Sequence, residues 1–268
     1  MDYLDKIKTE LKLRGNSNKT ISSYSFFLNK YLKAVDNPET ITLDKIKSYL
    51  ASQIDNYSNK SQALLISSLR FFYTYIIDKP EILKIKTPKK EKKLPVVLTK
   101  EEVKSLIQAA QFEKTELMVK MLYSTGLRVS ELVNLTPKDL DFQQNMGWVR
   151  KGKGSKDRTF NISEKLNKEL KKYLEKNQNN KYVFSQEQPL STRNIQLILK
   201  RLTKKANINK KVTPHTLRHS FATHLLDSGE NLVVIQQLLG HENLETTRIY
   251  VHISQEQLRK VKNPLDNL

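Results

Sequence analysis

The chain has 268 residues, of which 47 are lysine or arginine and 28 are aspartate or glutamate, so its formal net charge is +19. This excess of positive charge indicates a polyanionic partner, most simply nucleic acid. No apolar run approaches the roughly 18 residues that a membrane span needs and no signal-peptide pattern opens the sequence, so we expect a cytoplasmic protein that does not enter a membrane. The absence of cysteine excludes disulfides and thiolate zinc sites.

The first part of the chain predicts helices and no strand. Apolar residues recur at helical spacing over residues 2–13 and 18–34, and over two further segments that follow Thr42 and Ser58. Four amphipathic helices of this length make a small bundle. We therefore predict a helical domain over residues 1–85.

A lysine-rich segment follows this bundle. The stretch KIKTPKKEKK, residues 84–93, holds six lysines and one glutamate, with Pro88 inside it and Pro95 just after it. Proline and charge without any periodicity are typical of an extended linker. We predict a linker over residues 86–96 and a second domain over residues 97–268.

The second domain begins with a clear helix start. Thr99 and Glu102 have capping-box spacing, and Leu98 and Val103 have the spacing of a hydrophobic staple. Helices are predicted to about residue 111, from about 115 to 123, and over 127–135.

The pattern changes to period two after Pro137. It predicts strands at Phe142, over 148–151 and over 158–162, the last two joined as a hairpin by the turn at Gly152 and Gly154. Helices resume over 163–177 and 191–206, with a short strand candidate at 182–185 between them.

The final third is predicted to be helical. Thr213 has the position of an N-cap with Pro214 at the first helical position. Further helices are expected over 231–239 and 245–252, and a tail helix from about residue 254. The predicted fold class is mainly α with a small antiparallel β-sheet (α+β).

Four of the five histidines fall between residues 213 and 250, which suggests a site there. His215 and Arg218 are three residues apart and share one face at the start of a helix, where free N–H groups favour an anion. A metal pair at His215 and His219 is the weaker interpretation, because HTLRH lacks the glutamate of the HExxH motif and places a cation between the ligands. We predict no metal and no cofactor. His224 is interpreted as a packed side chain.

Five motifs together resemble the tyrosine recombinase family, and their order and spacing are similar to the Xer-type members. The motifs are TGLRVSEL with Arg128, GKGSKDR with Lys153, HTLRH with His215 and Arg218, LGH ending at His241, and TTRIY with Tyr250. The resemblance covers the second domain, and the four-helix first domain resembles the core-binding domain of the family, which implies that residues 1–85 bind DNA.

The resemblance implies a set of catalytic roles. Tyr250 would be the nucleophile that forms a 3′-phosphotyrosyl bond with DNA, and Lys153 would protonate the 5′-oxygen leaving group. Arg128 and Arg218 would hold the non-bridging oxygens of the phosphate.

The two remaining site histidines would support this chemistry. His215 would assist proton transfer, and His241 would hydrogen-bond the phosphate or position the tyrosine. Glu131, one helical turn after Arg128, would orient that arginine, or would be a solvated surface acid.

The implied activity is site-specific recombination through a Holliday junction, by a homo-oligomer (a dimer or tetramer) on double-stranded DNA with paired half-sites. No further domain precedes the four helices, so resolution of chromosome dimers is favoured over a phage integrase. A recombinase of a plasmid or mobile element, a type IB topoisomerase and a non-catalytic basic DNA-binding protein are the alternatives. The tail is expected to dock on a neighbouring protomer or, alternatively, on its own domain.

The linker supplies a first test. Each lysine that neutralises a phosphate releases condensed counterions, so DNA affinity depends on salt. Replacing four of the linker lysines with glutamine is expected to flatten the dependence of log Kd on log salt concentration in a binding titration. An unchanged slope would mean that the linker is only a tether.

Overall fold

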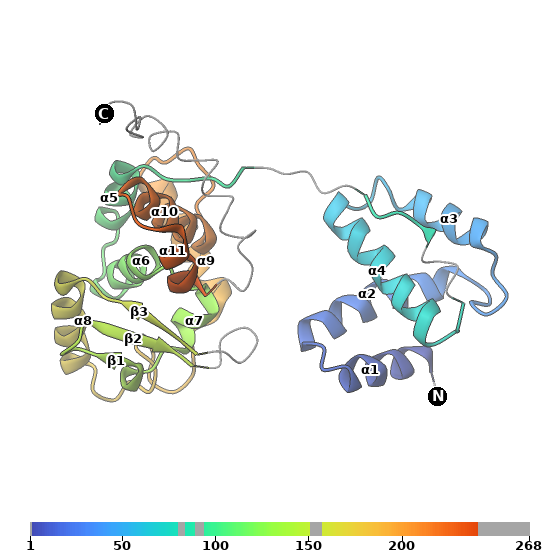
Figure 1. The fold of residues 1–268 in the computed structure, drawn as a ribbon, viewed down its shortest axis with the longest axis horizontal. Helices are drawn as coiled ribbons and strands as arrows, with labels where there is room; N and C mark the ends of the chain where they lie inside the picture. The colour runs from blue at the N-terminus through green and yellow to red at the C-terminus, as the bar shows by residue number, and fades with distance from the viewer. Residues whose placement is uncertain (1, 80–83, 89–93, 151–156, 241–268) are drawn as a thin grey trace, which may run out of the picture. The chain divides into compact units, whose positions relative to one another are not determined.

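The structure is a computed structural model that describes residues 2–79, 84–88, 94–150 and 157–240. It divides the chain into two compact units, residues 1–92 and residues 93–268 (Figure 1). The predicted helix at 245–252 and the predicted tail helix lie outside the described residues.

The described part of the first unit contains four α-helices, as predicted. They are α1 (Tyr3–Leu13), α2 (Asn18–Ala34), α3 (Leu43–Ser52) and α4 (Asn59–Tyr75). Ser17, Thr42 and Ser58 cap the last three, because each side-chain oxygen accepts the backbone N–H three residues ahead. Tyr31 and Tyr73 are buried in the core, and their hydroxyls hydrogen-bond to each other at 2.5 Å. The pairing satisfies two polar groups that would otherwise be costly to bury.

The second unit contains the remaining helices and strands of the described chain. They are α5 (Lys100–Gln108), α6 (Glu113–Thr125), α7 (Val129–Asn134), η2 (Pro137–Asp139), β1 (Leu140–Asp141), β2 (Met146–Val149), β3 (Arg158–Asn161), α8 (Glu164–Lys176), α9 (Thr192–Lys205), α10 (Pro214–Asp227) and α11 (Leu232–Leu239). The predicted class, mainly helical with a small antiparallel sheet, is confirmed.

Local signals set several helix starts in this unit. Thr99 and Glu102 form the predicted capping box at α5, and Leu98 and Val103 are both buried. Thr213 caps α10 by accepting the Thr216 N–H at 3.1 Å. These starts depend on neighbours in sequence, so they are visible before the fold is known.

The three strands form an antiparallel sheet in the order β1-β2-β3. In the β2–β3 hairpin Met146 pairs with Asn161 and Val149 pairs with Arg158. The connection that holds Lys153, residues 151–156, lies outside the described residues. The pairing of Val149 with Arg158 nevertheless shows that the end of β2 lies beside the start of β3.

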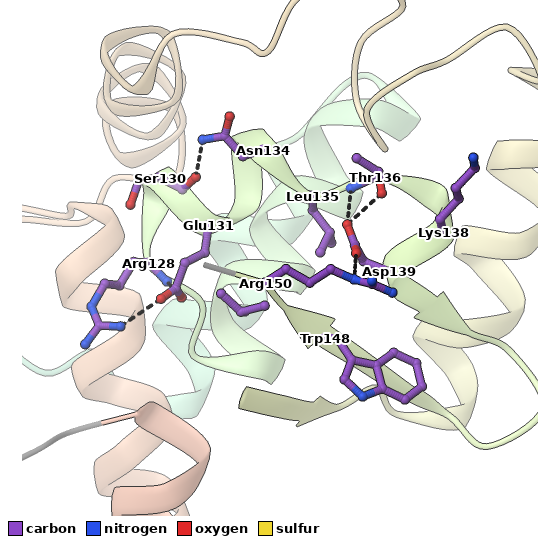
Figure 2. Close-up of a pocket in the computed structure, with 11 residues that line it drawn as sticks. Arg128, Ser130, Glu131, Asn134, Leu135, Thr136, Lys138, Asp139, Trp148 and Arg150 are labelled. Atoms are coloured by element: carbon purple, nitrogen blue, oxygen red, sulfur yellow. Dashed lines mark hydrogen bonds and ion pairs between the residues drawn. The ribbon is translucent and has the colours of Figure 1, made fainter. Parts of the chain in front are cut away.

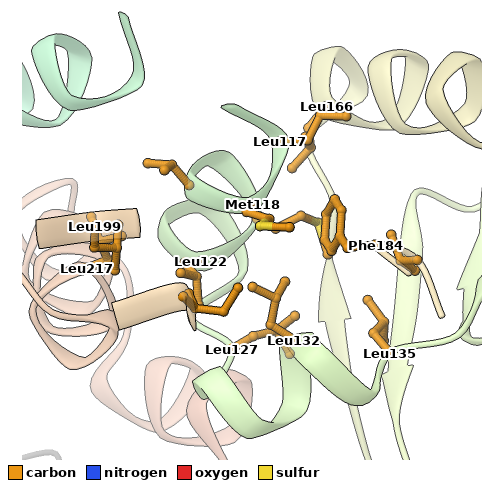
Figure 3. Packing of buried hydrophobic residues seen from close by; sticks show 14 of the residues in the cluster. Leu117, Met118, Leu122, Leu127, Leu132, Leu135, Leu166, Phe184, Leu199 and Leu217 are labelled. Atoms are coloured by element: carbon orange, nitrogen blue, oxygen red, sulfur yellow. The ribbon is translucent and has the colours of Figure 1, made fainter. Parts of the chain in front are cut away.

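Helix α6 lies at the centre of the second core. It packs against α5, α7, α8 and α10, and six of its thirteen residues are buried. Figure 3 shows its Leu117, Met118 and Leu122 among side chains from α7, α8, α9 and α10. A helix that is buried on most sides carries apolar residues around its circumference. It therefore supports α7 and α10, the helices that carry the candidate arginines.

Two expectations about local structure were wrong. Residues 182–185 form a tight turn with one isolated bridge, in which the Tyr182 N–H donates to the Ser185 carbonyl at 3.0 Å. The apolar residues that suggested a strand, Val183 and Phe184, are apolar because they fill the core. The helix predicted over 127–135 begins at Val129, because Arg128 has extended backbone angles and is the N-cap.

Among the described helices, none is long and apolar enough to cross a membrane.

Candidate active site

A sharp turn between α6 and α7 places Arg128. Gly126 ends α6 with φ +62°, a left-handed conformation that disfavours other residues. A Cβ atom added at Gly126 would lie 2.6 Å from the Phe221 ring of α10, so the turn and α10 are in close contact. Arg128 therefore begins α7 beside the helix that carries His215 and Arg218.

Glu131 holds the Arg128 guanidinium. The Arg128 Nη1 donates to Glu131 Oε1 at 2.7 Å, and the Arg128 backbone N–H donates to Glu131 Oε2 at 2.7 Å (Figure 2). The Glu131 side chain is 7% exposed and that of Arg128 is 24% exposed. Of the two interpretations of Glu131, the structure supports the one in which it binds and orients Arg128, and not the one in which it is a solvated surface acid.

Arg218 is buried between the ends of two helices. Its guanidinium donates to the carbonyl of Gly126, which ends α6, and to that of Leu239, the last residue of α11. The last carbonyls of a helix have no partner within the helix and carry partial negative charge. They are therefore suitable partners for a buried cation, and they fix the direction of this side chain.

The end of α11 brings the two candidate arginines together. Arg218 donates to the Leu239 carbonyl, and the Arg128 Nη2 donates to the next carbonyl, that of Gly240, at 3.2 Å. Residues ninety positions apart thus bind consecutive carbonyls. Gly240 ends α11 with φ +61°, and the next residue in sequence is His241.

A third arginine, Arg158 at the start of β3, completes this cluster. Its Nη2 lies 2.6 Å from Glu131 Oε2, and its Nη1 donates to the Leu238 carbonyl. Sequence reasoning missed Arg158, although it is the last residue of the motif GKGSKDR from which Lys153 was selected. In the sequence, Arg158 is a cation at the start of a predicted strand. Such a side chain is solvated more often than buried, so it did not indicate a site.

The charges in this cluster offset one another. Burial by itself raises the pKa of Glu131, but the charges of Arg158 and Arg128 and the Arg128 N–H outweigh burial and hold that pKa below its usual value. Burial lowers the pKa of Arg158, and Glu131 opposes this effect. Glu131 is therefore ionised at neutral pH and shares its charge between two guanidinium groups.

The histidines of α10 differ in their surroundings. His215 is exposed in the first turn, and its pKa is lowered by partial desolvation and by the charges of Arg218 and Arg128. His224 accepts from or donates to the Tyr123 hydroxyl at 2.8 Å through its Nδ1 and packs on that ring, as expected for a structural side chain. Among the described residues, no group of three His, Cys, Asp or Glu side chains has the arrangement of a metal site.

A cavity of about 690 Å³ opens beside Arg128 and Glu131. It lies between α7 and β2, with Trp148 and Arg150 on its β2 side (Figure 2). The Arg150 Nε pairs with Asp139 Oδ1 at 2.9 Å, and Asp139 also accepts the Thr136 N–H and hydroxyl. The rim of the cavity is therefore cationic, and its acidic side chains, Glu131 and Asp139, already bind neighbouring groups of the protein.

The structure brings together three of the six predicted catalytic residues, Arg128, His215 and Arg218. The other three, Lys153, His241 and Tyr250, lie outside the described residues.

Comparison with known proteins identifies the family. The model of the phage integrase family matches residues 96–257, and that of the N-terminal SAM-like domain of phage integrases matches residues 3–82. The chain is 38% identical to tyrosine recombinase XerA of Pyrococcus horikoshii over 97% of its own length and 92% of that protein. It is 37% identical to tyrosine recombinase XerD of Staphylococcus epidermidis over 97% of its length and 95% of that protein. The chain is an Xer-like tyrosine recombinase of the phage integrase family.

Solved structures agree with this assignment. A crystal structure of XerA recombinase is 35% identical, matches with a TM-score of 0.58 and covers 96% of each chain. XerH site-specific recombinase bound to a palindromic difH substrate, at 23% identity and a TM-score of 0.76, covers 96% of this chain and 82% of its own and shows the same fold.

His219 gives this recombinase a testable pH dependence. Burial first, then the charges of His215 and Arg218, lower the pKa of His219 from 6.5 to about 4. As the pH falls, His219 in the unfolded chain therefore binds a proton near pH 6.5, whereas His219 in the folded chain binds one only near pH 4. The free energy of unfolding consequently falls as the pH falls through this window. The loss attributable to His219 is roughly 3 kcal/mol at most.

Urea unfolding at several pH values between 7 and 4.5 measures this loss. Carboxylates titrate in the same range, so the quantity of interest is the difference between the wild type and His219→Gln. We expect a shallower fall in the variant. Parallel curves would contradict the burial of a neutral imidazole at this position.

Proposed function

We propose that this recombinase cuts DNA by attack of the Tyr250 hydroxyl on a phosphodiester and rejoins it in a new combination. The observation that carries the proposal is the convergence of Arg128 and Arg218 on consecutive carbonyls at the end of α11, directly before His241. Two guanidinium groups held in one place can bind the two non-bridging oxygens of a phosphate.

The reaction proceeds through a pentavalent phosphorus centre. The Tyr250 hydroxyl gives up its proton, with the neutral imidazole of His215 as the candidate acceptor, and its oxygen bonds to phosphorus while the bond from phosphorus to the 5′-oxygen breaks. A 3′-phosphotyrosyl linkage and, once the 5′-oxygen is protonated, a free 5′-hydroxyl result. Lys153 supplies the proton that the 5′-oxygen needs in order to leave. Attack by the 5′-hydroxyl of a partner strand reverses the step and joins the exchanged strands.

The arginines stabilise the charge that gathers on the non-bridging oxygens in the transition state. Arg128 is the more accessible of the pair, and Glu131 fixes its orientation. His215, exposed beside both arginines with a lowered pKa, assists proton transfer as a neutral imidazole. His241, next in sequence to Gly240, contacts the phosphate or positions Tyr250.

The distribution of charge supports double-stranded DNA as the partner. The chain has a net charge of +19, and α9 carries a group of exposed cations. They are Arg193, Lys200, Arg201, Lys204 and Lys205. Such a surface neutralises backbone phosphates whatever the sequence of the DNA.

We further propose that the protein acts in the cytoplasm as a dimer or tetramer on paired half-sites and resolves chromosome dimers through a Holliday junction. This proposal is supported by the sequence match to relatives named XerA and XerD, which covers more than nine-tenths of the length of each relative. The tail from about residue 254 is proposed to dock on a neighbouring protomer.

Tyr250→Phe tests the nucleophile. The variant keeps the ring but loses the hydroxyl, so we expect unchanged DNA affinity and no covalent adduct with a nicked suicide duplex. Electrophoresis under denaturing conditions detects the adduct, and filter binding measures the affinity. An adduct that persists in the variant would falsify the assignment of Tyr250.

Lys153→Ala tests the general acid. Loss of a general acid typically slows the step by about 10²- to 10⁴-fold, so cleavage of an ordinary duplex should fall by that order. A duplex with a 5′-bridging sulfur at the scissile position has a leaving group that needs no proton, and cleavage of it should return to near the wild-type rate. Arg128→Ala is the matched control and should remain slow on the sulfur duplex. Failure of the Lys153 rescue would move the acid role to another residue.

A further inference from the structure

Arg158 is buried at the point where three segments of the site meet. Its side chain is 10% exposed, and it comes from the first residue of β3. It contacts Glu131 of α7 through an ion pair of 2.6 Å and the Leu238 carbonyl of α11 through a hydrogen bond. Because it is so little exposed, it cannot itself serve as a general DNA-backbone contact.

The side chain of Arg158 also packs under the end of α11. A Cβ atom added at Gly240 would lie 2.5 Å from Arg158 Cδ, so the glycine backbone rests directly on the aliphatic part of the arginine. Three consecutive carbonyls, those of Leu238, Leu239 and Gly240, therefore each accept from a different arginine. Arg158 takes the first, Arg218 the second and Arg128 the third.

The charge of Glu131 explains how Arg158 can affect Arg128. Oε1 of Glu131 accepts from the Arg128 guanidinium, whereas Oε2 accepts from the Arg128 backbone N–H and from Arg158 Nη2. Without Arg158 the buried carboxylate would have Arg128 as its only cationic partner among the residues that the structure describes. It would then compete more strongly with a phosphate for that guanidinium, because opposite charges attract more strongly where water is excluded.

We propose that Arg158 is a positioning residue of the recombination reaction, which holds Glu131 and the end of α11 together and leaves the charge of Arg128 available to the scissile phosphate. The proposal rests on the proposed function of Arg128 as part of the phosphate clamp. It assigns a role to the last residue of GKGSKDR that is separate from that of Lys153 in the same motif.

Arg158→Met is the informative variant, because methionine keeps much of the length and removes the charge. Lys120→Met is the matched control. Lys120 bridges Glu116 and Glu169 between α6 and α8 in the same unit, with a side chain that is 19% exposed, and is not part of the site. Thermal unfolding and DNA affinity are measured for both variants before cleavage.

Three nicked suicide duplexes then separate the possible roles. One has an ordinary scissile phosphodiester, one has a neutral methylphosphonate there, and one has a 5′-bridging sulfur. The methylphosphonate lacks one non-bridging charge and depends less on the arginines. The sulfur duplex removes only the need for a proton.

We expect Arg158→Met to form the Tyr250 adduct with the phosphodiester roughly 10- to 100-fold more slowly than the wild type, the range typical of residues that orient a directly acting group. Most of this difference should disappear with the methylphosphonate and persist with the sulfur duplex. Lys120→Met should match the wild type on all three.

The other outcomes overturn the proposal. An equal defect on all three duplexes means that Arg158 only maintains the fold, and rescue by the sulfur duplex means that it acts through the leaving-group proton. A wild-type rate means that it has no role. If the wild type forms no adduct at all, the proposed function itself has failed, and this result is distinct from the three above.

A second comparison covers the case in which Arg158→Met does not fold. The double variant Glu131→Gln, Arg158→Met removes both charges of this ion pair, and this typically costs less stability than removing one charge and leaving the other unpaired. Glutamine keeps an acceptor for Arg128. The double variant is expected to cleave the phosphodiester faster than Glu131→Ala, and an equal or lower rate overturns the proposal.

Discussion

The site depends on the hydrogen-bond partners of the last backbone carbonyls of α11. A helix leaves its last carbonyls without intrahelical partners, and these carry the negative end of the helix dipole. Here three consecutive carbonyls accept from guanidinium groups that come from three separate segments, at residues 128, 158 and 218. No local part of the chain contains this arrangement, so it exists only when the whole second unit is folded.

Three arginines in one place would repel one another without compensation. Glu131 supplies a full negative charge to two of them, and the ends of α6 and α11 supply partial charges to the third. Removing one partner of a buried pair typically costs about 3–5 kcal/mol, because the other charge is left without compensation. The cluster is therefore balanced as a unit, and its members cannot be considered one by one.

The parts of the fold that the sequence predicts are those with local causes. The capping box of Thr99 and Glu102, the N-cap at Thr213 and the β2–β3 hairpin follow from short-range spacing, and all three are present. Arg128, at the start of α7, and Arg218, on α10, were found because the family resemblance gives each of them a role, whereas it gives none to Arg158 in the motif GKGSKDR. Arg158 was missed because its importance comes from Glu131 and Leu238, which are distant in sequence. The turn at 182–185 was misjudged for a related reason, since Val183 is apolar because of tertiary packing.

The two arginines of the proposed phosphate clamp are not equivalent in the structure. Arg218 is 3% exposed and donates to two carbonyls, whereas Arg128 is 24% exposed and its contact with Gly240, at 3.2 Å, is long for a charged donor. A phosphate oxygen carries more charge than a carbonyl oxygen, so it competes most easily for the accessible donor with the longest contact. Under the proposed function, Arg128 is therefore the group that would exchange the Gly240 carbonyl for a DNA phosphate. The exchange would release the Gly240 carbonyl at the end of α11, so binding of the phosphate would be coupled to the contacts of that helix end.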